Sequence, residues 1–291
     1  MQDIMNLKRF YYLGRFNSLT GAWLLILPSF WSIACNVNSL AWNQQVYYYG
    51  IFVLGALFMR SFGCVINDLV DINIDKQVAR TKNRPLASGL VTKKEAILFA
   101  MLLLIIPIMI FLTLSMFAKI VAISSLFFVF LYPFSKRFFQ APQLILGIAF
   151  NWGILLSDAV INNTISNISI ILYVASIFWT VAYDTVYAYQ DYKDDKRIGV
   201  KSTAILMGDE PKVYLFILYL LMMLCIMVIM YLWQMIFYSY IGIFIAFLYI
   251  FFNLYKLDHT DSNDCFNFFK KNIIFGLLLW LIFIIMSIYK Y

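Results

Sequence analysis

Long runs of apolar residues, separated by short polar segments, recur along the whole chain. Each run has the length, about 17–25 residues, that crosses the hydrocarbon core of a membrane as a helix. Strand-type alternation is absent, and a backbone in lipid must satisfy its own hydrogen bonds, so helices are predicted. The nine expected spans are Leu19–Cys35, Val46–Ile66, Ala96–Met116, Ala118–Phe134, Leu144–Val160, Ile168–Tyr189, Val213–Trp233, Ile236–Tyr255 and Ile273–Tyr289.

The composition also indicates a membrane protein. Hydrophobic residues make up 63% of the 291 residues and charged residues 13%. An ordinary soluble domain has about 45–50% apolar and about 25% charged residues. We therefore predict an all-α integral membrane protein that forms one transmembrane domain over residues 1–291.

Basic residues are distributed unevenly between the expected loops. Of the 22 Lys and Arg residues, 19 precede the first span or lie in the loops between spans 2–3, 4–5, 6–7 and 8–9. Lys119 and Lys290 lie on the other side, and Arg60 lies inside the second span. The positive-inside rule therefore predicts a cytoplasmic N-terminus. Because the basic residues are dispersed over span ends, we expect them to meet lipid headgroups and not nucleic acid.

Acidic residues cluster directly after the second span. Asn67, Asp71 and Asp75 recur every four residues, and Asp68 lies beside them. If the helix continues past the span, these side chains share one face. Stacked carboxylates at ~4 Å repel by about 1 kcal/mol per pair in water and about 4 kcal/mol at an effective dielectric of 20. The pattern therefore predicts a bound cation.

A second acidic group directly follows the sixth span. Asp191 and Asp195 are again four residues apart, with Asp194 between them, and Asp184 lies seven residues before Asp191 inside the span. Spans 2–3 and 6–7 thus look like a loose internal duplication, which would place both acidic groups on one membrane face. Oxygen ligands, in a chain whose only histidine is His259, suit Mg²⁺, which often recruits substrate phosphates as well.

Basic side chains that could hold a phosphate surround both acidic groups. Arg grips phosphate oxygens with two parallel hydrogen bonds, whereas Lys acts as a point charge. Carboxylates, a divalent cation and basic residues together predict a diphosphate site; a solvated loop of mixed charge is the alternative. The residues concerned are Lys76, Arg80, Lys82, Arg84, Lys193, Lys196, Arg197 and Lys201.

Four sequence strings carry a resemblance to a known family. Residues 67–75 match N-D-x-x-D-x-x-x-D, and residues 80–89 resemble R-T-x-x-R-P-L-x-S-G. Residues 183–204 resemble Y-D-T-x-Y-A-x-x-D-x-x-D-D…G-x-K-S-T-A, and residues 132–137 resemble Y-P-x-x-K-R. In these strings the sequence resembles the UbiA-type membrane prenyltransferases, and within them the 4-hydroxybenzoate polyprenyltransferases of ubiquinone synthesis.

Two positions depart from the pattern of that family. Before the first span the family reads R-x-D-K-P-x-G, whereas residues 15–21 here keep only Arg15 and Gly21. The acidic and basic residues of the family pattern are missing here, so this segment has no counterpart for their role in the cavity. Asn151 stands where the family commonly has a small residue, which would narrow the cavity.

The resemblance implies a fold and a reaction. The fold has about nine transmembrane helices around a central cavity, with the active site on the cytoplasmic side of a bacterial inner membrane. The reaction transfers a polyprenyl chain from polyprenyl diphosphate to the ring carbon of 4-hydroxybenzoate ortho to its hydroxyl and releases diphosphate. Mg²⁺ would neutralise the leaving group. No protein partner is identified.

The resemblance also implies roles for individual residues. The expected metal ligands are Asn67, Asp68, Asp71, Asp75, Asp191 and Asp195, and the expected catalytic residues are Asp71, Asp75, Asp191, Asp195 and Arg137. The expected substrate-binding residues are Arg60, Lys76, Arg80, Arg84, Lys136, Asp184, Tyr187, Lys193 and Lys201. Arg137 is the candidate for the acceptor carboxylate, and Asp191 could instead deprotonate the acceptor phenol. The intramembrane Arg60 and Asp184 are expected to line the cavity.

Other functions remain open from sequence alone. The same chemistry could act on homogentisate, a naphthoate or haem. A cation-coupled transporter would also carry intramembrane charges, but it would place acids near mid-span in broken helices. Here most acids lie at span ends, which favours the prenyltransferase.

Overall fold

The computed structural model describes residues 2–235 and 237–289. Over these residues the regular structure is entirely helical, which confirms the all-α prediction. Ile236, where the eighth expected span begins, and Lys290 lie outside the described residues. The elements are α1 (Gln2–Leu13), α2 (Thr20–Ala34), η1 (Val37–Ser39), α3 (Trp42–Asp75), α4 (Lys93–Leu103), α5 (Ile105–Thr113), α6 (Met116–Phe138), α7 (Pro142–Phe150), α8 (Trp152–Asn162), α9 (Asn167–Ala188), η2 (Tyr189–Asp191), α10 (Tyr192–Ile198), α11 (Thr203–Met207), α12 (Pro211–Leu232), α13 (Phe237–Lys256) and α14 (Ser262–Tyr289).

The described chain contains 8 helical segments that are long and apolar enough to cross a membrane. They are α3, α4 with α5, α6, α7 with α8, α9 through α10, α12, α13 and α14. The first expected span corresponds to α2, which is apolar but has only 15 residues, fewer than the ~20 that a span needs. The count of nine spans, the cytoplasmic N-terminus and the internal duplication therefore stay predictions.

Two of the spans are broken by identifiable residues. α4 ends one residue before Leu104 and α5 begins one residue after it. Pro107 has no N–H to donate to the Leu103 carbonyl four residues earlier, so the helix cannot continue unchanged there. The break between α7 and α8 lies at Asn151, whose side-chain Nδ2 donates to the Gly147 carbonyl at 2.7 Å. These breaks turn single helices into pairs of shorter ones.

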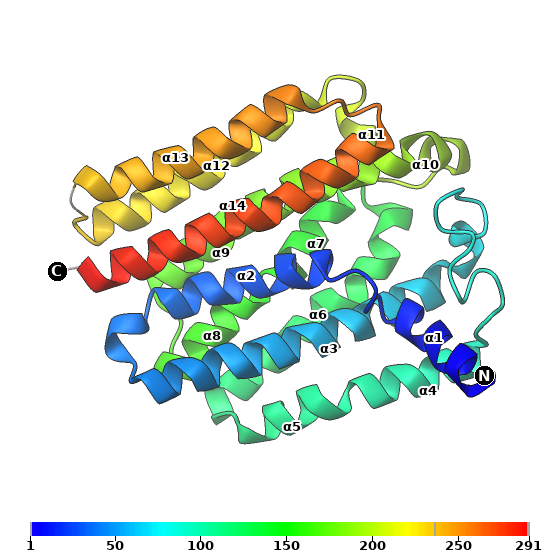
Figure 1. Ribbon diagram of the computed structural model, residues 1–291, viewed down its shortest axis with the longest axis horizontal. Helices are drawn as coiled ribbons and strands as arrows, with labels where there is room; N and C mark the ends of the chain where they lie inside the picture. The colour runs from blue at the N-terminus through cyan, green and yellow to red at the C-terminus, as the bar shows by residue number, and fades with distance from the viewer. Residues whose placement is uncertain (1, 236, 290–291) are drawn as a thin grey trace.

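Most of the long helices run along the length of the molecule, and the two termini lie at opposite ends (Figure 1). α12 and α13 form one outer side of the bundle, and α4 and α5 form the other. α10, α11, the loop after α3 and the N-terminal helix α1 all lie at one end. The two acidic groups, at the end of α3 and around α10, are therefore at the same end of the molecule, as the sequence predicted.

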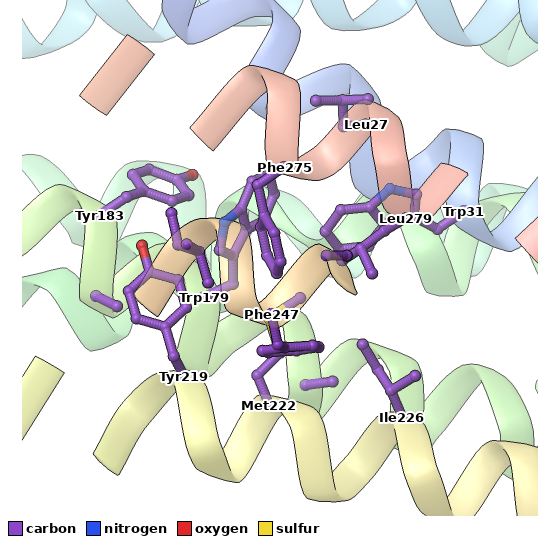
Figure 2. Close-up of a cluster of buried hydrophobic side chains, with 14 of the residues drawn as sticks. Leu27, Trp31, Trp179, Tyr183, Tyr219, Met222, Ile226, Phe247, Phe275 and Leu279 are labelled. Carbon is purple, nitrogen blue, oxygen red and sulfur yellow. The ribbon is translucent and has the colours of Figure 1, made fainter. Parts of the chain in front are cut away.

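The main core is built by α2, α9, α12, α13 and α14. Its large aromatic and aliphatic side chains pack between these helices (Figure 2). The polar atoms of Trp31, Trp179 and Tyr219 are hydrogen-bonded, as burial away from water favours. Trp31 donates to the Gly276 carbonyl at 2.8 Å, and the Asn272 side-chain oxygen accepts from Trp179 at 2.9 Å and from Tyr219 at 2.7 Å. This core fixes α9, which carries part of the site.

Many large apolar side chains are exposed on the outer helices. Examples are Met101, Met109, Phe127, Phe244 and Phe252, each at least half exposed. A soluble monomer rarely exposes apolar patches of more than a few hundred Å². The exposed apolar surface therefore agrees with an integral membrane protein whose outer face meets lipid.

Candidate active site

The first acidic group lies on α3, which is longer than a membrane is thick. α3 has 34 residues, so at 1.5 Å per residue it is about 51 Å long, against a hydrocarbon core of about 30 Å. The helix continues without a break through Asp75, as the four-residue spacing predicted. Asp68, Asp71 and Asp75 are all buried. Buried carboxylates need partners, and each of the three has basic ones.

Arg84 joins two of these carboxylates. Its Nη1 donates to Asp68 Oδ1 at 3.1 Å and to both oxygens of Asp75 at 3.1 and 3.0 Å. Burial lowers the pKa of the Arg84 guanidinium, but the charges of Asp68 and Asp75 raise it by more, so this pKa lies above its ordinary value. Arg84 is therefore a permanent cation held between the two carboxylates.

Asp68 has a second arginine partner that the sequence did not identify. Arg15 donates from Nη2 to Asp68 Oδ1 at 2.8 Å and to Oδ2 at 2.7 Å. Its backbone is left-handed, with φ of 59°, a conformation that is uncommon for residues other than glycine. Arg15 is one of the two residues of its segment that match the family pattern, and that match is the signal that could have found it.

Asp71 faces a different pair of basic residues, from the end of α6. Lys136 Nζ forms an ion pair with Asp71 Oδ2, and Arg137 Nη2 lies 3.3 Å from Oδ1. Arg137 also donates to the carbonyls of Val70 and Pro133. The Y-P-x-x-K-R string therefore meets the first acidic group directly.

The second acidic group does not lie on one continuous α-helix. α9 ends at Ala188, a 3-10 turn covers Tyr189–Asp191, and α10 begins at Tyr192. Asp191 accepts two hydrogen bonds from Arg80, from Nε at 2.9 Å and from Nη2 at 2.5 Å. Arg80 Nη1 also donates to the Tyr187 hydroxyl at 2.7 Å. Burial lowers the pKa of Arg80, but its hydrogen bond to Asp191 and the neighbouring charges raise it by more, so this pKa lies above its ordinary value.

Further contacts tie the loop after α3 to α10. The Ala79 backbone N–H donates to Asp194 Oδ2 at 2.8 Å, and Arg197 donates to the Gln77 carbonyl at 2.8 Å. Lys136, the partner of Asp71, also acts electrostatically on Asp195. The two acidic groups thus face one another across a shared set of basic side chains.

A cavity of about 1230 Å³ begins at this polar end and continues between the helices. Its lining follows α3 from Phe52 to Asp68, a distance of about 24 Å at 1.5 Å per residue. Near Asp68 the lining is polar, and near Phe52 it is apolar, with Phe111, Leu114 and Val160 opposite. Of the residues expected to bind metal or substrate, the lining includes Asn67, Asp68, Arg60, Arg80, Arg84, Asp184 and Tyr187.

Arg60 lines the cavity inside the span, as predicted. Its Nη1 donates to the Arg15 carbonyl at 3.5 Å, and no acidic partner pairs with it among the described residues. The guanidinium packs against Gly21, where an added Cβ would lie 2.8 Å from both Nε and Nη2. Gly21 therefore leaves space for a cation that has no carboxylate partner in the described part of the chain.

Some residues predicted for the site lie apart from the cavity. Lys76 and Lys193 are exposed, and Lys201 Nζ donates to the Phe138 carbonyl at the end of α6. Lys201 thus ties the segment before α11 to the end of α6. The Asp195 side chain forms no hydrogen bond or ion pair with any residue that the structure describes, although the charges of Asp191, Lys136 and Arg80 act on it.

The acidic groups offer donors of the kind that Mg²⁺ prefers. Every donor is a carboxylate or amide oxygen, and nitrogen and sulfur ligands are absent from the set. In the arrangement described, Arg and Lys side chains balance the negative charge of Asp68, Asp71, Asp75 and Asp191. Over residues 2–235 and 237–289, no three acidic, His or Cys side chains converge on one point. The donor chemistry fits Mg²⁺, and a bound ion would compete with these basic partners.

Comparisons with known proteins agree with this site. The sequence profile of the UbiA prenyltransferase family matches residues 18–286. A 4-hydroxybenzoate octaprenyltransferase of Francisella tularensis subsp. tularensis (strain WY96-3418) is 35% identical over 284 residues, 98% of this chain and 97% of the relative. A 4-hydroxybenzoate octaprenyltransferase of Saccharophagus degradans (strain 2-40) is 37% identical over 270 residues, 92% of this chain and 89% of the relative.

Solved structures share the fold. The apo structure of a UbiA homolog from Aeropyrum pernix K1 has a TM-score of 0.72 at 18% identity, covering 90% of this chain and 97% of the homolog. A UbiA homolog from Archaeoglobus fulgidus, bound to GPP and Mg²⁺, has a TM-score of 0.71 at 17% identity, covering 96% and 99%. The sequence match covers most of the chain, and the chain belongs to the UbiA prenyltransferase family.

Proposed function

We propose that this protein is a 4-hydroxybenzoate polyprenyltransferase. It transfers a polyprenyl chain from polyprenyl diphosphate to the ring carbon ortho to the hydroxyl of 4-hydroxybenzoate, with release of diphosphate, in ubiquinone biosynthesis. The observation that carries this proposal is a cavity whose apolar channel ends at facing acidic groups and paired arginines. The names of the relatives at 35% and 37% identity support the acceptor.

The apolar part of the cavity suits an isoprenoid tail. Each buried CH₂ group contributes about 0.8 kcal/mol, so the tail needs no polar recognition. The channel runs about 24 Å along α3 between Phe52 and Asp68, and its far end is lined by side chains such as Leu114. An entering chain would therefore place its diphosphate beside Asp68, Arg84 and Arg80.

We assign the metal to the oxygen donors Asn67, Asp68, Asp71, Asp75, Asp191 and Asp195. When bound there, Mg²⁺ would neutralise the negative charge that develops on the leaving diphosphate. The Archaeoglobus fulgidus homolog bound to GPP and Mg²⁺ supports this choice of ion. Arg80 and Arg84, now paired with these carboxylates, would turn toward phosphate oxygens once the carboxylates hold metal.

The acceptor carboxylate has two candidate partners in this chain. Arg137, which the sequence favoured, pairs with Asp71 and does not line the cavity in the part of the chain that the structure describes. Arg60 lines the cavity and lacks an acidic partner among the same residues. An unpaired arginine at mid-membrane costs about 2.5–3.5 kcal/mol, and a substrate carboxylate would offset that cost. We therefore assign the carboxylate to Arg60, with Arg137 as the alternative.

The cavity wall near the polar end is rich in aromatic rings. Phe62, Phe130, Tyr132, Tyr183 and Phe269 all contribute to the lining. Their π faces stabilise positive charge on the allylic carbon as the diphosphate departs. The apolar side chains of the wall disfavour water, which would otherwise quench this carbon. We place this end of the cavity at the cytoplasmic face of a bacterial inner membrane, because the basic loops lie there.

A direct assay tests the proposal. Membranes containing the protein are incubated with octaprenyl diphosphate, ring-labelled 4-hydroxybenzoate and Mg²⁺, and the label extracted into hexane is counted. We expect a hydrophobic labelled product that disappears when EDTA removes the metal and returns when Mg²⁺ is added back. Homogentisate as a competitor should not reduce the signal. No labelled product with 4-hydroxybenzoate, at any Mg²⁺ concentration, would contradict the proposal.

A further inference from the structure

We propose that Asp184 is the catalytic base that takes the proton of the acceptor phenol, an inference that rests on the proposed function. Asp184 lies on α9 and lines the cavity. Its carboxylate forms no hydrogen bond and no ion pair with the residues described, although Arg80 and the phenol of Tyr132 lie within electrostatic range. A carboxylate left without a donor inside a span is costly unless a ligand supplies one.

Asp68, the other carboxylate of the cavity lining, is already engaged, and so are its neighbours Asp75 and Asp191. Asp68 and Asp75 share Arg84, and Asp191 accepts two hydrogen bonds from Arg80. A carboxylate with both oxygens bonded to a guanidinium is a poor base, because a proton must displace the cation. Asp191, the sequence-based alternative for this role, also does not line the cavity in the described part of the chain.

The position of Asp184 suits the hydroxyl end of the acceptor. Arg60 on α3 and Asp184 on α9 are intramembrane groups of opposite charge that line the same cavity. 4-Hydroxybenzoate carries a carboxylate at one end of its ring and a hydroxyl at the other. With Arg60 on the carboxylate, Asp184 is the group of the cavity wall able to accept the phenol proton without leaving an ion pair.

The step balances as follows. The bond between the allylic carbon and the diphosphate oxygen breaks, and its electron pair leaves with diphosphate. The phenol proton passes to Asp184, and the ring carbon ortho to the oxygen forms the new carbon–carbon bond, giving a neutral dienone. The ring C–H proton then leaves with the diphosphate, and Asp184 returns its proton to the ring oxygen, which restores the aromatic ring.

Rates with two acceptor substrates distinguish a catalytic role of Asp184 from a structural one. The nitrogen of 4-aminobenzoate activates its ring without losing a proton, so its prenylation does not need the base. Asp184→Asn should lower the rate with 4-hydroxybenzoate by about 100-fold or more, the usual contribution of a general base, and the rate with 4-aminobenzoate by less than about 5-fold. Asp184→Glu, which keeps a carboxylate, should recover part of the activity with 4-hydroxybenzoate. Equal losses with both acceptors, or none, would overturn the assignment.

A pH profile gives a readout that does not depend on the second acceptor. Without Asp184, hydroxide must remove the phenol proton, so the rate of Asp184→Asn should rise with pH up to about 9 more steeply than the wild-type rate. Asp158→Asn serves as the matched control, because Asp158 is a buried carboxylate on α8 that accepts from Asn162 and from the Ser166 N–H. Asp158→Asn should change the rates with the two acceptors by the same factor. Wild-type protein inactive with both acceptors would instead refute the proposed function itself.

Discussion

Arg80 and Asp191 form a two-point ion pair, with Nε to Oδ1 at 2.9 Å and Nη2 to Oδ2 at 2.5 Å. Arg80 belongs to the loop after the first acidic group, and Asp191 belongs to the second group, 111 residues later in the chain. The fork geometry of the guanidinium makes this contact directional as well as electrostatic. The pair therefore links the two halves of the site directly.

Arg80→Lys should impair the site although the charge is kept. A lysine cannot bond both oxygens of Asp191 and also reach the Tyr187 hydroxyl, because it is a point charge without the planar fork. We expect the KM for polyprenyl diphosphate to rise by about 10-fold or more, as for the loss of one charged hydrogen bond. Arg197→Lys is the matched control, since Arg197 is 65% exposed and such pairs contribute about 0–1 kcal/mol. A wild-type KM for Arg80→Lys would be evidence against this role.

Arg60→Met and Arg137→Met distinguish the two candidates for the acceptor carboxylate. If Arg60 binds it, Arg60→Met should raise the KM for 4-hydroxybenzoate by about 10–100-fold, the range for a hydrogen bond to a charged group. It should leave the KM for polyprenyl diphosphate nearly unchanged. Steady-state rates with each substrate varied in turn provide the measurement. The opposite pattern, with only Arg137→Met affecting the acceptor KM, would return the role to Arg137.

Gly21→Ala should disturb Arg60 without harming the fold. The new Cβ would lie 2.8 Å from Nε and Nη2 of Arg60, and those atoms can move because they end a flexible side chain. Alanine favours a helix by about 1 kcal/mol over glycine, so the melting temperature in detergent should hold or rise while the acceptor KM increases. Gly50→Ala, where an added Cβ meets nothing within 4 Å, should leave the KM unchanged. Equal acceptor KM values for the two variants would contradict the contact.

Gly276→Ala should lower the stability of the main core. An added Cβ would lie 2.6 Å from Leu27 Cδ1 and 3.3 Å from Trp179 Cη2, and overpacking of this kind costs about 1–3 kcal/mol. Thermal melting in detergent, followed by tryptophan fluorescence, should show a lower midpoint than wild type. Gly242→Ala is the control, since its Cβ would meet Ile282 at 3.6 Å, an ordinary contact. A midpoint unchanged by Gly276→Ala would show that the core has room there.

The sequence predicted the elements that local pattern determines. The apolar runs predicted the helices, and the four-residue spacing of Asn67, Asp71 and Asp75 predicted the continuation of α3. The basic residues near them were expected to bind phosphate, and the structure pairs one of them, Arg84, with two of the carboxylates. The break between α4 and α5 follows from Pro107 itself, which has no N–H to donate. The break at Asn151 depends on the carbonyls that its side chain contacts, including that of Ser176 on α9, and contacts between distant segments have no local signature.

Which acid meets which base also depends on the tertiary structure. Arg137 stands in a string typical of the site, yet in the fold it faces Asp71. Arg15 bonds to Asp68, which lies 53 residues later in the chain. The backbone of Arg15 is left-handed, and the sequence does not predict that conformation. The turn at Tyr189–Asp191 likewise changes the direction of Asp191 relative to the helical spacing. The sequence therefore identified most members of the site, Arg15 excepted, but not their pairings.

The central claim is that the two acidic groups bind one metal-diphosphate ligand together. The most direct measurement is the affinity of the purified protein for geranyl diphosphate with Mg²⁺, by calorimetry, in wild type, Asp71→Asn, Asp191→Asn and the double variant. Groups that act as a unit give strongly non-additive losses, so each single variant should lose most of the affinity and the double variant little more. Losses that multiply in the double variant, or a single variant that binds like wild type, would contradict a shared site.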